Sequence, residues 1–278
     1  MNKEIVIQGK RVFYRIEGEG RPLVLVHGFG ETGDIWDTQV AFLKGQFRLI
    51  VPDLPGSGRS EMIDDMSMEG MAEIIRTLLE TEHFGAGAEN GVGELERDAI
   101  VIGHSMGGYI TLAFAERYPQ YLRAFGLFHS TAFPDTEEKI ATRRKGIGFM
   151  KEHGGFAFLK NIVPNLFSPV TKAENQPLID GFLASLNNFS TESLVSYYES
   201  MIRRPDRTAV LKTTRNPVLL IMGKYDTAIP PDDGLKLGKL PEIAYIHILG
   251  QSGHMGMLEE AERSNQLLQK FVTDAWNF

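Results

Sequence analysis

The stretch AIVIGHSMGG, residues 99–108, places a serine between an apolar run and a helical pattern. Ser105 is the centre of Gly103-His104-Ser105-Met106-Gly107, a Gly-x-Ser-x-Gly motif. Where this motif joins a strand to a helix, the serine lies on a sharp, strained turn that exposes its hydroxyl. The positions two residues away on either side must then be small, and both are glycine. The motif alone is common by chance, but this context predicts a nucleophilic serine at the end of a central strand.

Apolar runs and helical patterns alternate along the chain on both sides of this motif. The runs expected as strands are 5–7, 12–16, 23–26, 47–51, 99–102, 124–128, 218–222 and 245–249. Helical spacing of apolar residues marks 35–43, 68–82, 107–117 and 258–272. This alternation predicts an α/β fold, in which helices flank a mostly parallel eight-stranded sheet that begins with an antiparallel hairpin.

The alternation stops near residue 131 and resumes near residue 208, with several helical patterns and no expected strand in between. We expect residues 131–207 to form a helical cap, inserted into a core domain made of 1–130 and 208–278. The apolar residues of this stretch are rich in phenylalanine; most should pack the cap itself, and a minority should contact substrate. The arginines expected in solvent are Arg143, Arg144, Arg203 and Arg204.

A serine hydroxyl is a weak nucleophile at neutral pH, so it needs a nearby base and an acid that orients this base. Asp226 follows the expected strand 218–222, and His254 follows the expected strand 245–249. Either residue alone could be an ordinary loop residue. Their joint position at two strand ends, in the order Ser, Asp, His, predicts Ser105 as nucleophile, His254 as base and Asp226 as the orienting acid.

The remaining histidines are less suited to act as the base. His83 and His153 lie in helical or loop patterns away from the strand ends, and His247 lies within a strand. His104 is the variable position of the serine motif. His129 lies where the chain leaves the core for the cap, so we expect it only to line the pocket.

The carbonyl oxygen under attack becomes negative in the transition state and needs two backbone N–H donors. One expected donor is the amide of Met106, directly after the nucleophile. The other is the amide of Phe29, in the segment HGFG at 27–30 that follows an early strand. Glycines in this segment let the backbone approach the substrate, and His27 is expected to brace the loop by hydrogen bonding.

Composition excludes several classes of function. A formal charge of -7 leaves no basic stripe for nucleic acid, and the absence of cysteine excludes disulfides and thiolate metal sites. No apolar run approaches the ~20 residues that a membrane span requires. Residues 1–10 alternate in charge and hydropathy, unlike a signal segment. We expect a cytoplasmic monomer or homodimer that acts on a small molecule, with no metal and no organic cofactor.

Residues 85–93 contain four glycines and few apolar residues, which is typical of a surface loop. A Gly-x-Gly pair occurs there, but no expected strand leads into it and the longer dinucleotide-binding pattern is not completed. The segment therefore predicts a loop before the central strand rather than a nucleotide site.

Five segments together resemble the α/β-hydrolase fold superfamily: HGFG at 27–30, DLPGSGRS at 53–60, GHSMGG at 103–108, GKYD at 223–226 and SGH at 252–254. They occur in the order and spacing typical of that superfamily, from the first hairpin to the last helix. The resemblance implies a cap after the sixth strand and a structural turn at 53–60. A serine at position 105 separates the chain from haloalkane dehalogenases and epoxide hydrolases, whose similar frame carries an aspartate nucleophile.

The resemblance implies acyl transfer through a serine ester, with small, largely apolar carboxylic esters as the expected substrates. Lactones, thioesters and the carbon–carbon bonds of ring-cleavage products stay open, because the fold does not fix the substrate. A different class of function also stays open: a ligand-binding regulator that keeps the triad, turns over slowly and signals through its cap. The complete catalytic set favours an enzyme.

Overall fold

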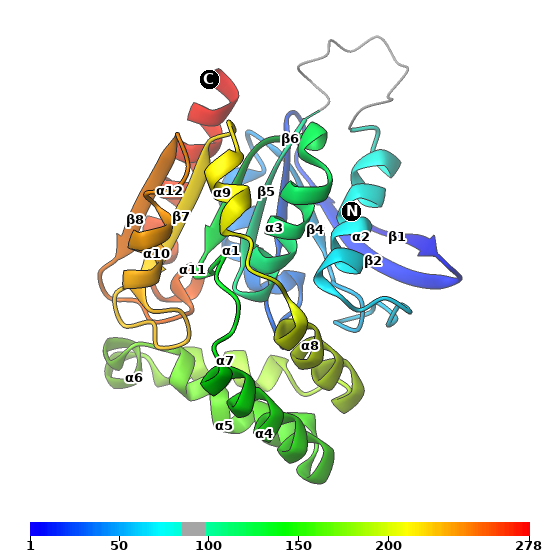
Figure 1. The fold of residues 1–278 in the computed structure, drawn as a ribbon, viewed down its shortest axis with the longest axis vertical. Helices are drawn as coiled ribbons and strands as arrows, with labels where there is room; N and C mark the ends of the chain where they lie inside the picture. The colour runs from blue at the N-terminus through cyan, green and yellow to red at the C-terminus, as the bar shows by residue number, and fades with distance from the viewer. Residues whose placement is uncertain (85–97) are drawn as a thin grey trace.

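The computed structural model describes residues 1–84 and 98–278, so the surface loop expected at 85–93 lies outside the described residues. Eight strands form one sheet in the order β1-β2-β4-β3-β5-β6-β7-β8 (Figure 1). Their bounds are β1 Asn2–Ile7, β2 Lys10–Glu17, β3 Pro22–Val26, β4 Arg48–Pro52, β5 Ala99–His104, β6 Leu122–Phe128, β7 Val218–Gly223 and β8 Ala244–Leu249. Each run expected as a strand forms one, and the α/β prediction is confirmed.

The sheet is parallel from β4 to β8 and antiparallel at its first edge. β1 pairs with β2, and β2 with β4, in antiparallel register, so the opening hairpin is confirmed. The parallel register aligns Val26 with Gly103 and aligns His104 with Phe128. Gly223 of β7 lies beside Leu249 of β8. The carboxyl ends of these six parallel strands therefore meet at one edge of the sheet, and the loops that carry the expected site residues leave from that edge.

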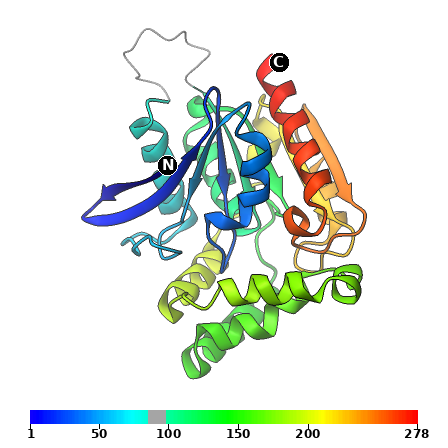
Figure 2. The ribbon, with the colours of Figure 1, turned by 180° about the vertical axis from the view of Figure 1, so that it is seen from behind.

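Helices cover both faces of the sheet. On one face lie α2 (Met68–Thr81) and α3 (Met106–Arg117), and on the other lie α1 (Asp37–Leu43) and α12 (Ala261–Asn277) (Figure 1, Figure 2). Shorter helical elements complete the core: η1 Gly33–Trp36, η3 Pro119–Tyr121, α9 Thr208–Thr213, α10 Pro231–Leu237 and α11 Gly256–Glu259. Of these, η3, α9 and α10 have no counterpart among the expected helices.

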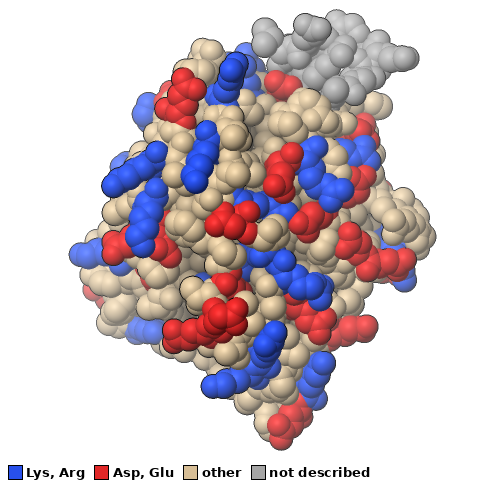
Figure 3. All heavy atoms as spheres, in the orientation of Figure 1, with Lys and Arg blue, Asp and Glu red and all other residues tan. Residues whose placement is uncertain are grey.

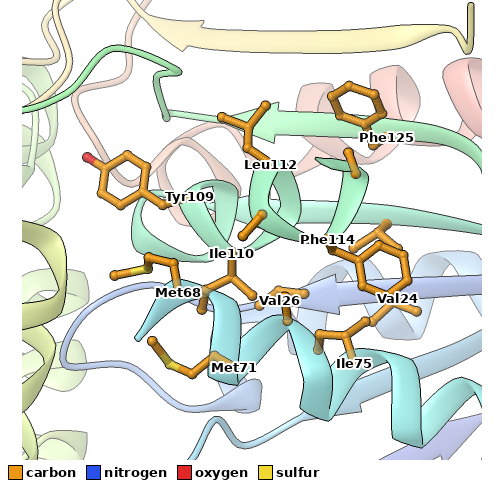
Figure 4. Close-up of a cluster of buried hydrophobic side chains, with 14 of the residues drawn as sticks. Val24, Val26, Met68, Met71, Ile75, Tyr109, Ile110, Leu112, Phe114 and Phe125 are labelled. Carbon is orange, nitrogen blue, oxygen red and sulfur yellow. The ribbon is translucent and has the colours of Figure 1, made fainter. Parts of the chain in front are cut away.

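The face under α2 and α3 holds a buried apolar cluster (Figure 4). Met68, Met71 and Ile75 are spaced three and four residues apart, so they lie on the same side of α2 and face the sheet. The hydroxyl of Ser67 begins α2 by accepting a hydrogen bond from the Gly70 N–H over 3.0 Å. This packing fixes α3, and with it the turn at the start of α3 that carries the motif serine.

Five helices lie beyond the carboxyl ends of the strands (Figure 1). Their bounds are α4 Glu137–His153, α5 Gly155–Ile162, α6 Pro169–Glu174, α7 Gln176–Ser185 and α8 Thr191–Arg203, with the short η4 Val163–Leu166 between α5 and α6. Residues 131–207, all of which are described, contain no strand. The division into a core of 1–130 and 208–278 and a cap of 131–207 stays a prediction, and we use the word cap for these residues.

Two of the four cap arginines do not lie in solvent as expected. Arg204 is buried, and the side chain of Arg143 is 11% exposed. The reason is Asp135, a buried carboxylate that accepts hydrogen bonds from Arg143 Nε over 2.6 Å and from an Arg204 terminal nitrogen over 2.9 Å. Arg144 and Arg203 are exposed, as expected.

Acidic and basic side chains are interspersed over the face of the molecule shown in Figure 3. Among the helices of the described residues, none combines the length and the apolar character that crossing a bilayer would require.

Candidate active site

Ser105 occupies a strained turn between β5 and α3. Its backbone has φ 50° and ψ -115°, a left-handed region that non-glycine residues rarely adopt. A Cβ at Gly103 would lie 2.1 Å from the Gly107 carbonyl oxygen, and one at Gly107 would lie 2.4 Å from the Val26 carbonyl oxygen. Glycine is therefore required at both positions. This requirement is the physical reason that the Gly-x-Ser-x-Gly motif predicted a strained turn at Ser105.

Asp226 and His254 meet at the same edge of the sheet. Nδ1–H of His254 donates to Asp226 Oδ2 over 2.8 Å, and the other carboxylate oxygen accepts the N–H groups of Ala228 and Ile229, each over 2.9 Å. Burial raises the pKa of Asp226, but the charge of His254 and the hydrogen bonds from two histidines outweigh it and hold this pKa well below its usual range. Asp226 is therefore an ionised carboxylate that fixes the orientation of the His254 ring.

The imidazole of His254 lies beside the serine turn. The centroid of this ring is 4.9 Å from that of His104, the residue before Ser105. The backbone carbonyl oxygen of His254 accepts the His104 Nε2–H over 3.0 Å. Within the described chain, the Ser105 hydroxyl makes no hydrogen bond to His254. Hydrogen bonds between a nucleophile and its base are often long without substrate and shorten in the complex. The structure thus brings Asp226 and His254 together and places both next to the turn of Ser105.

The expected oxyanion donors lie on either side of this turn. Phe29 follows β3, the strand that pairs with β5, and Met106 is the first residue of α3. In the part of the chain that the structure describes, neither amide has a hydrogen-bond acceptor. His27 braces the loop as expected, since its Nε2 accepts the Leu54 N–H over 2.9 Å. The oxyanion role of these two amides stays a prediction.

Comparison with known proteins identifies the family of the chain. The model of the Alpha/beta hydrolase family matches residues 23–267. The chain belongs to the alpha/beta hydrolase family. The eight-stranded sheet with its flanking helices is thus that of a hydrolase, and the expected resemblance is confirmed.

Relatives of this hydrolase differ in the reactions that their names describe. It is 31% identical over 280 residues to 2-hydroxy-6-oxononadienedioate/2-hydroxy-6-oxononatrienedioate hydrolase of Paraburkholderia phymatum, with 94% of this chain and 91% of that protein covered. It is 26% identical over 273 residues to pimeloyl-[acyl-carrier protein] methyl ester esterase of Methylococcus capsulatus, with 95% and 99% covered. A malate-bound thermophilic esterase from Thermogutta terrifontis superposes with a TM-score of 0.88 at 25% identity, with 99% of both chains covered.

The hydrolase has a buried ion pair between Glu31 and His104 that no sequence pattern signalled. Glu31 Oε2 accepts the Gly28 N–H over 2.7 Å and the His104 Nδ1–H over 2.9 Å. Burial raises the pKa of Glu31 and lowers that of His104, but their mutual attraction outweighs burial and reverses both shifts. A charged His104 donates from both ring nitrogens, to Glu31 and to the His254 carbonyl. The pair therefore ties the loop of Phe29, the serine turn and the loop of His254 together.

Glu31→Gln should lower the free energy of unfolding by about 3 kcal/mol at pH 6, because it removes one partner of a buried ion pair. A histidine whose pKa is raised from 6.5 contributes stability below that pH and loses it as the pH rises through the folded-state pKa. The deficit of the variant should therefore shrink at alkaline pH. Urea unfolding at pH 6 and pH 9 measures both values.

The matched control is Asp37→Asn, since Asp37 is exposed and pairs with Arg15 at the surface over 2.7 Å. We expect it to change the stability by less than about 1 kcal/mol at either pH. If the loss in the free energy of unfolding of Glu31→Gln were larger at pH 9 than at pH 6, the proposed charge of His104 would be wrong.

His129 was expected to line the pocket, but its side chain is fully buried. Its Nδ1–H donates to Asp226 Oδ2 over 3.2 Å. Among the described residues, His129, Asp226 and His254 are also a set whose potential metal-ligand atoms lie within 4.8 Å of one another. Two N–H···O hydrogen bonds, from His129 and His254 to Asp226, already join these atoms.

Cap side chains cover the loop that carries Phe29. The ring of Tyr198 lies 4.6 Å from that of Phe29, and the ring of Phe158 lies 6.4 Å from it. Tyr198 in turn contacts the guanidinium of Arg143, 5.0 Å above its ring. Two cap aromatics, Tyr198 and Phe158, thus contact Phe29, and contact of cap aromatics with substrate stays a prediction.

A separate groove of about 720 Å³ lies between the opening hairpin and α7. Residues lining it include Phe13, Arg59 and Phe182, but none of the triad or oxyanion residues. Because the reacting groups meet elsewhere, the groove carries no part of the proposed chemistry.

Proposed function

We propose that the protein is a serine hydrolase that cleaves small, largely apolar carboxylic esters through an acyl-enzyme intermediate. One observation carries the proposal: the 2.8 Å hydrogen bond between His254 and Asp226 lies directly beside the strained turn of Ser105. A serine on such a turn, a base beside it and a buried acid behind the base are the three parts that nucleophilic acyl transfer needs.

The proposed cycle has two halves. His254 removes the proton of Ser105, whose oxygen attacks the ester carbonyl, and the amides of Phe29 and Met106 stabilise the oxyanion. His254 then gives this proton to the leaving alcohol. Water, activated by the same imidazole, hydrolyses the acyl-enzyme and releases the acid. Asp226 stays ionised throughout and stabilises the imidazolium that forms twice in the cycle.

The aromatic cover over Phe29 supports an apolar substrate group. Tyr198 and Phe158 belong to the cap and lie against the residue whose amide should hold the oxyanion, so a bound acyl or alcohol group meets aromatic rings. The names of the Methylococcus capsulatus and Thermogutta terrifontis relatives also describe esterases. We therefore favour a small ester over lactones and thioesters.

Arg143 supports a second candidate, a carbon–carbon bond hydrolase acting on a substrate that bears a carboxylate. Two guanidinium groups, of Arg143 and Arg204, share one carboxylate, Asp135, so this buried cluster carries an excess positive charge. Arg143 also contacts Tyr198 beside Phe29. The name of the Paraburkholderia phymatum relative describes a dienedioate substrate with two carboxylates. The two candidates therefore differ in the charge of the substrate, which is neutral for the esterase and anionic for the carbon–carbon bond hydrolase.

A panel of p-nitrophenyl esters with acyl chains of increasing length, each with and without a terminal carboxylate, separates the two candidates. We expect kcat/KM to be highest for short neutral acyl groups and to fall once the chain exceeds the space under the cap. A preference of tenfold or more for the carboxylate series, about 1.4 kcal/mol, would favour the second candidate instead. Lactones and thioesters complete the panel.

The same panel distinguishes an enzyme from a ligand-binding regulator. Many turnovers for each protein molecule indicate an enzyme, whereas a single burst followed by cap rearrangement indicates a regulator. A cytoplasmic location and a monomeric or homodimeric state remain predictions from the sequence.

A further inference from the structure

His129 makes a hydrogen bond that the proposed mechanism does not use. Its Nδ1 lies 3.2 Å from Asp226 Oδ2, the same oxygen that accepts the His254 Nδ1–H over 2.8 Å. Both imidazoles are buried, and their centroids are 5.8 Å apart. Two histidines therefore share one oxygen of the expected catalytic acid.

The surroundings of His129 determine where its proton lies. Burial lowers its pKa to about 4, against the opposing effect of Asp226, so the ring is neutral at pH 7 and carries a single proton. Nε2 is buried and has no partner in the described part of the chain. A Cβ at Gly256 would lie 2.4 Å from this nitrogen, so the backbone of α11 closes over it. The proton is therefore on Nδ1, where Asp226 accepts it.

The backbone holds His129 in an uncommon conformation that aims the ring at Asp226. The residue directly follows β6 with φ 48°, and its N–H donates to the Ile221 carbonyl of β7 over 2.8 Å. A left-handed conformation costs free energy for a residue with a side chain and persists where the surrounding structure enforces it. The hydrogen bond to Ile221 supplies that restraint on His129. It comes from β7, the strand that leads to Asp226.

We propose that His129 is a positioning residue for Asp226, which holds Oδ2 in place and draws part of its negative charge away from His254. This rests on the proposed serine triad. The groups that face the acid are the amides of Ala228 and Ile229 on Oδ1, His254 and His129 on Oδ2, and His104 behind the His254 ring. Lys139 of α4 donates to the Ala228 carbonyl over 2.8 Å, so its charge lies on the same turn.

Loss of the His129 N–H has two consequences that can be measured separately. Asp226 becomes less restrained, so kcat falls. Its Oδ2 also keeps more negative charge for His254, so the imidazolium is more stable and the base stays protonated to higher pH. The acid limb of the kcat/KM profile should therefore move to higher pH, an effect that a space-filling role would not produce.

The matched pair is His129→Asn and His129→Leu, because the two new side chains have nearly the same shape and only asparagine can donate to Asp226. We expect His129→Asn to keep the acid limb of the wild type. His129→Leu should move this limb to higher pH by about 0.5 unit and lower kcat about tenfold. Because leucine is strained at positive φ, His129→Gly serves as a second variant that lacks the donor but tolerates this backbone.

Three outcomes decide the proposal. An acid limb that shifts in His129→Leu or His129→Gly but not in His129→Asn supports it. If the acid limb of the kcat/KM profile lies at the same pH in all the variants and kcat falls equally in all of them, His129 only fills space and the proposal is overturned. If a fluorophosphonate fails to label Ser105 of the wild-type protein, the triad itself is rejected, and the role of His129 with it.

Discussion

Ser105→Ala should fold as the wild type does and lose about 10⁴-fold or more of the esterase kcat. Alanine has no oxygen to attack the carbonyl, and no other hydroxyl is placed on the strained turn after β5. Alanine tolerates φ 50° about as well as serine, so thermal unfolding should change little. Labelling by a fluorophosphonate, followed by mass spectrometry of the modified peptide, measures the same loss without a substrate.

Ser185→Ala is the matched control, because Ser185 is an exposed serine at the end of α7. Its hydroxyl donates to the Phe182 carbonyl over 2.7 Å and is remote from the triad. We expect full labelling and full activity in this variant. Unchanged activity of Ser105→Ala would disprove the proposed nucleophile.

Motifs that depend on local backbone geometry could be predicted from the sequence. Gly103 and Gly107 mark the serine turn because a side chain at either position would collide with nearby backbone. Continuous apolar runs marked the buried strands, since a strand covered on both faces does not alternate between apolar and polar residues. The short helices α9 and α10 were missed because six or seven residues are too few to show a helical period.

Polar contacts between distant segments could not be predicted in this way. Glu31 and His104 are 73 residues apart, and nothing local to either residue signals a buried partner. The burial of Arg143 depends in the same way on Asp135, which has no such signal in the sequence. His129 was noticed only as a residue at a strand end. Its role depends on the parallel register of β6 and β7, which brings it beside the turn of Asp226.

Asp226→Asn should lower kcat about 10⁴-fold, because every polar group around this side chain is a donor. Oδ2 accepts from two imidazoles and Oδ1 from two backbone amides, so the NH₂ of asparagine must face at least one N–H. His254 can relieve this clash by moving its proton to Nε2. A proton on Nε2 removes the lone pair that should accept the Ser105 proton.

The same substitution should lower the free energy of unfolding by about 2 kcal/mol at pH 7, because buried donors lose a charged acceptor. The folded-state pKa of Asp226 lies below the 3.8 of a free aspartate, so the contribution of its charge to stability is complete above that pH and is lost as the pH falls further. The stability deficit of Asp226→Asn should therefore shrink below pH 4.

Asp232→Asn, at an exposed aspartate in the first turn of α10, is the matched control and should change neither kcat nor stability by a comparable amount. Urea unfolding across this pH range and kcat at pH 7 measure the two effects on the same samples. Full activity of Asp226→Asn would show that His254 is oriented by another group. Retention of kcat with a loss of stability alone would reduce Asp226 to a structural residue.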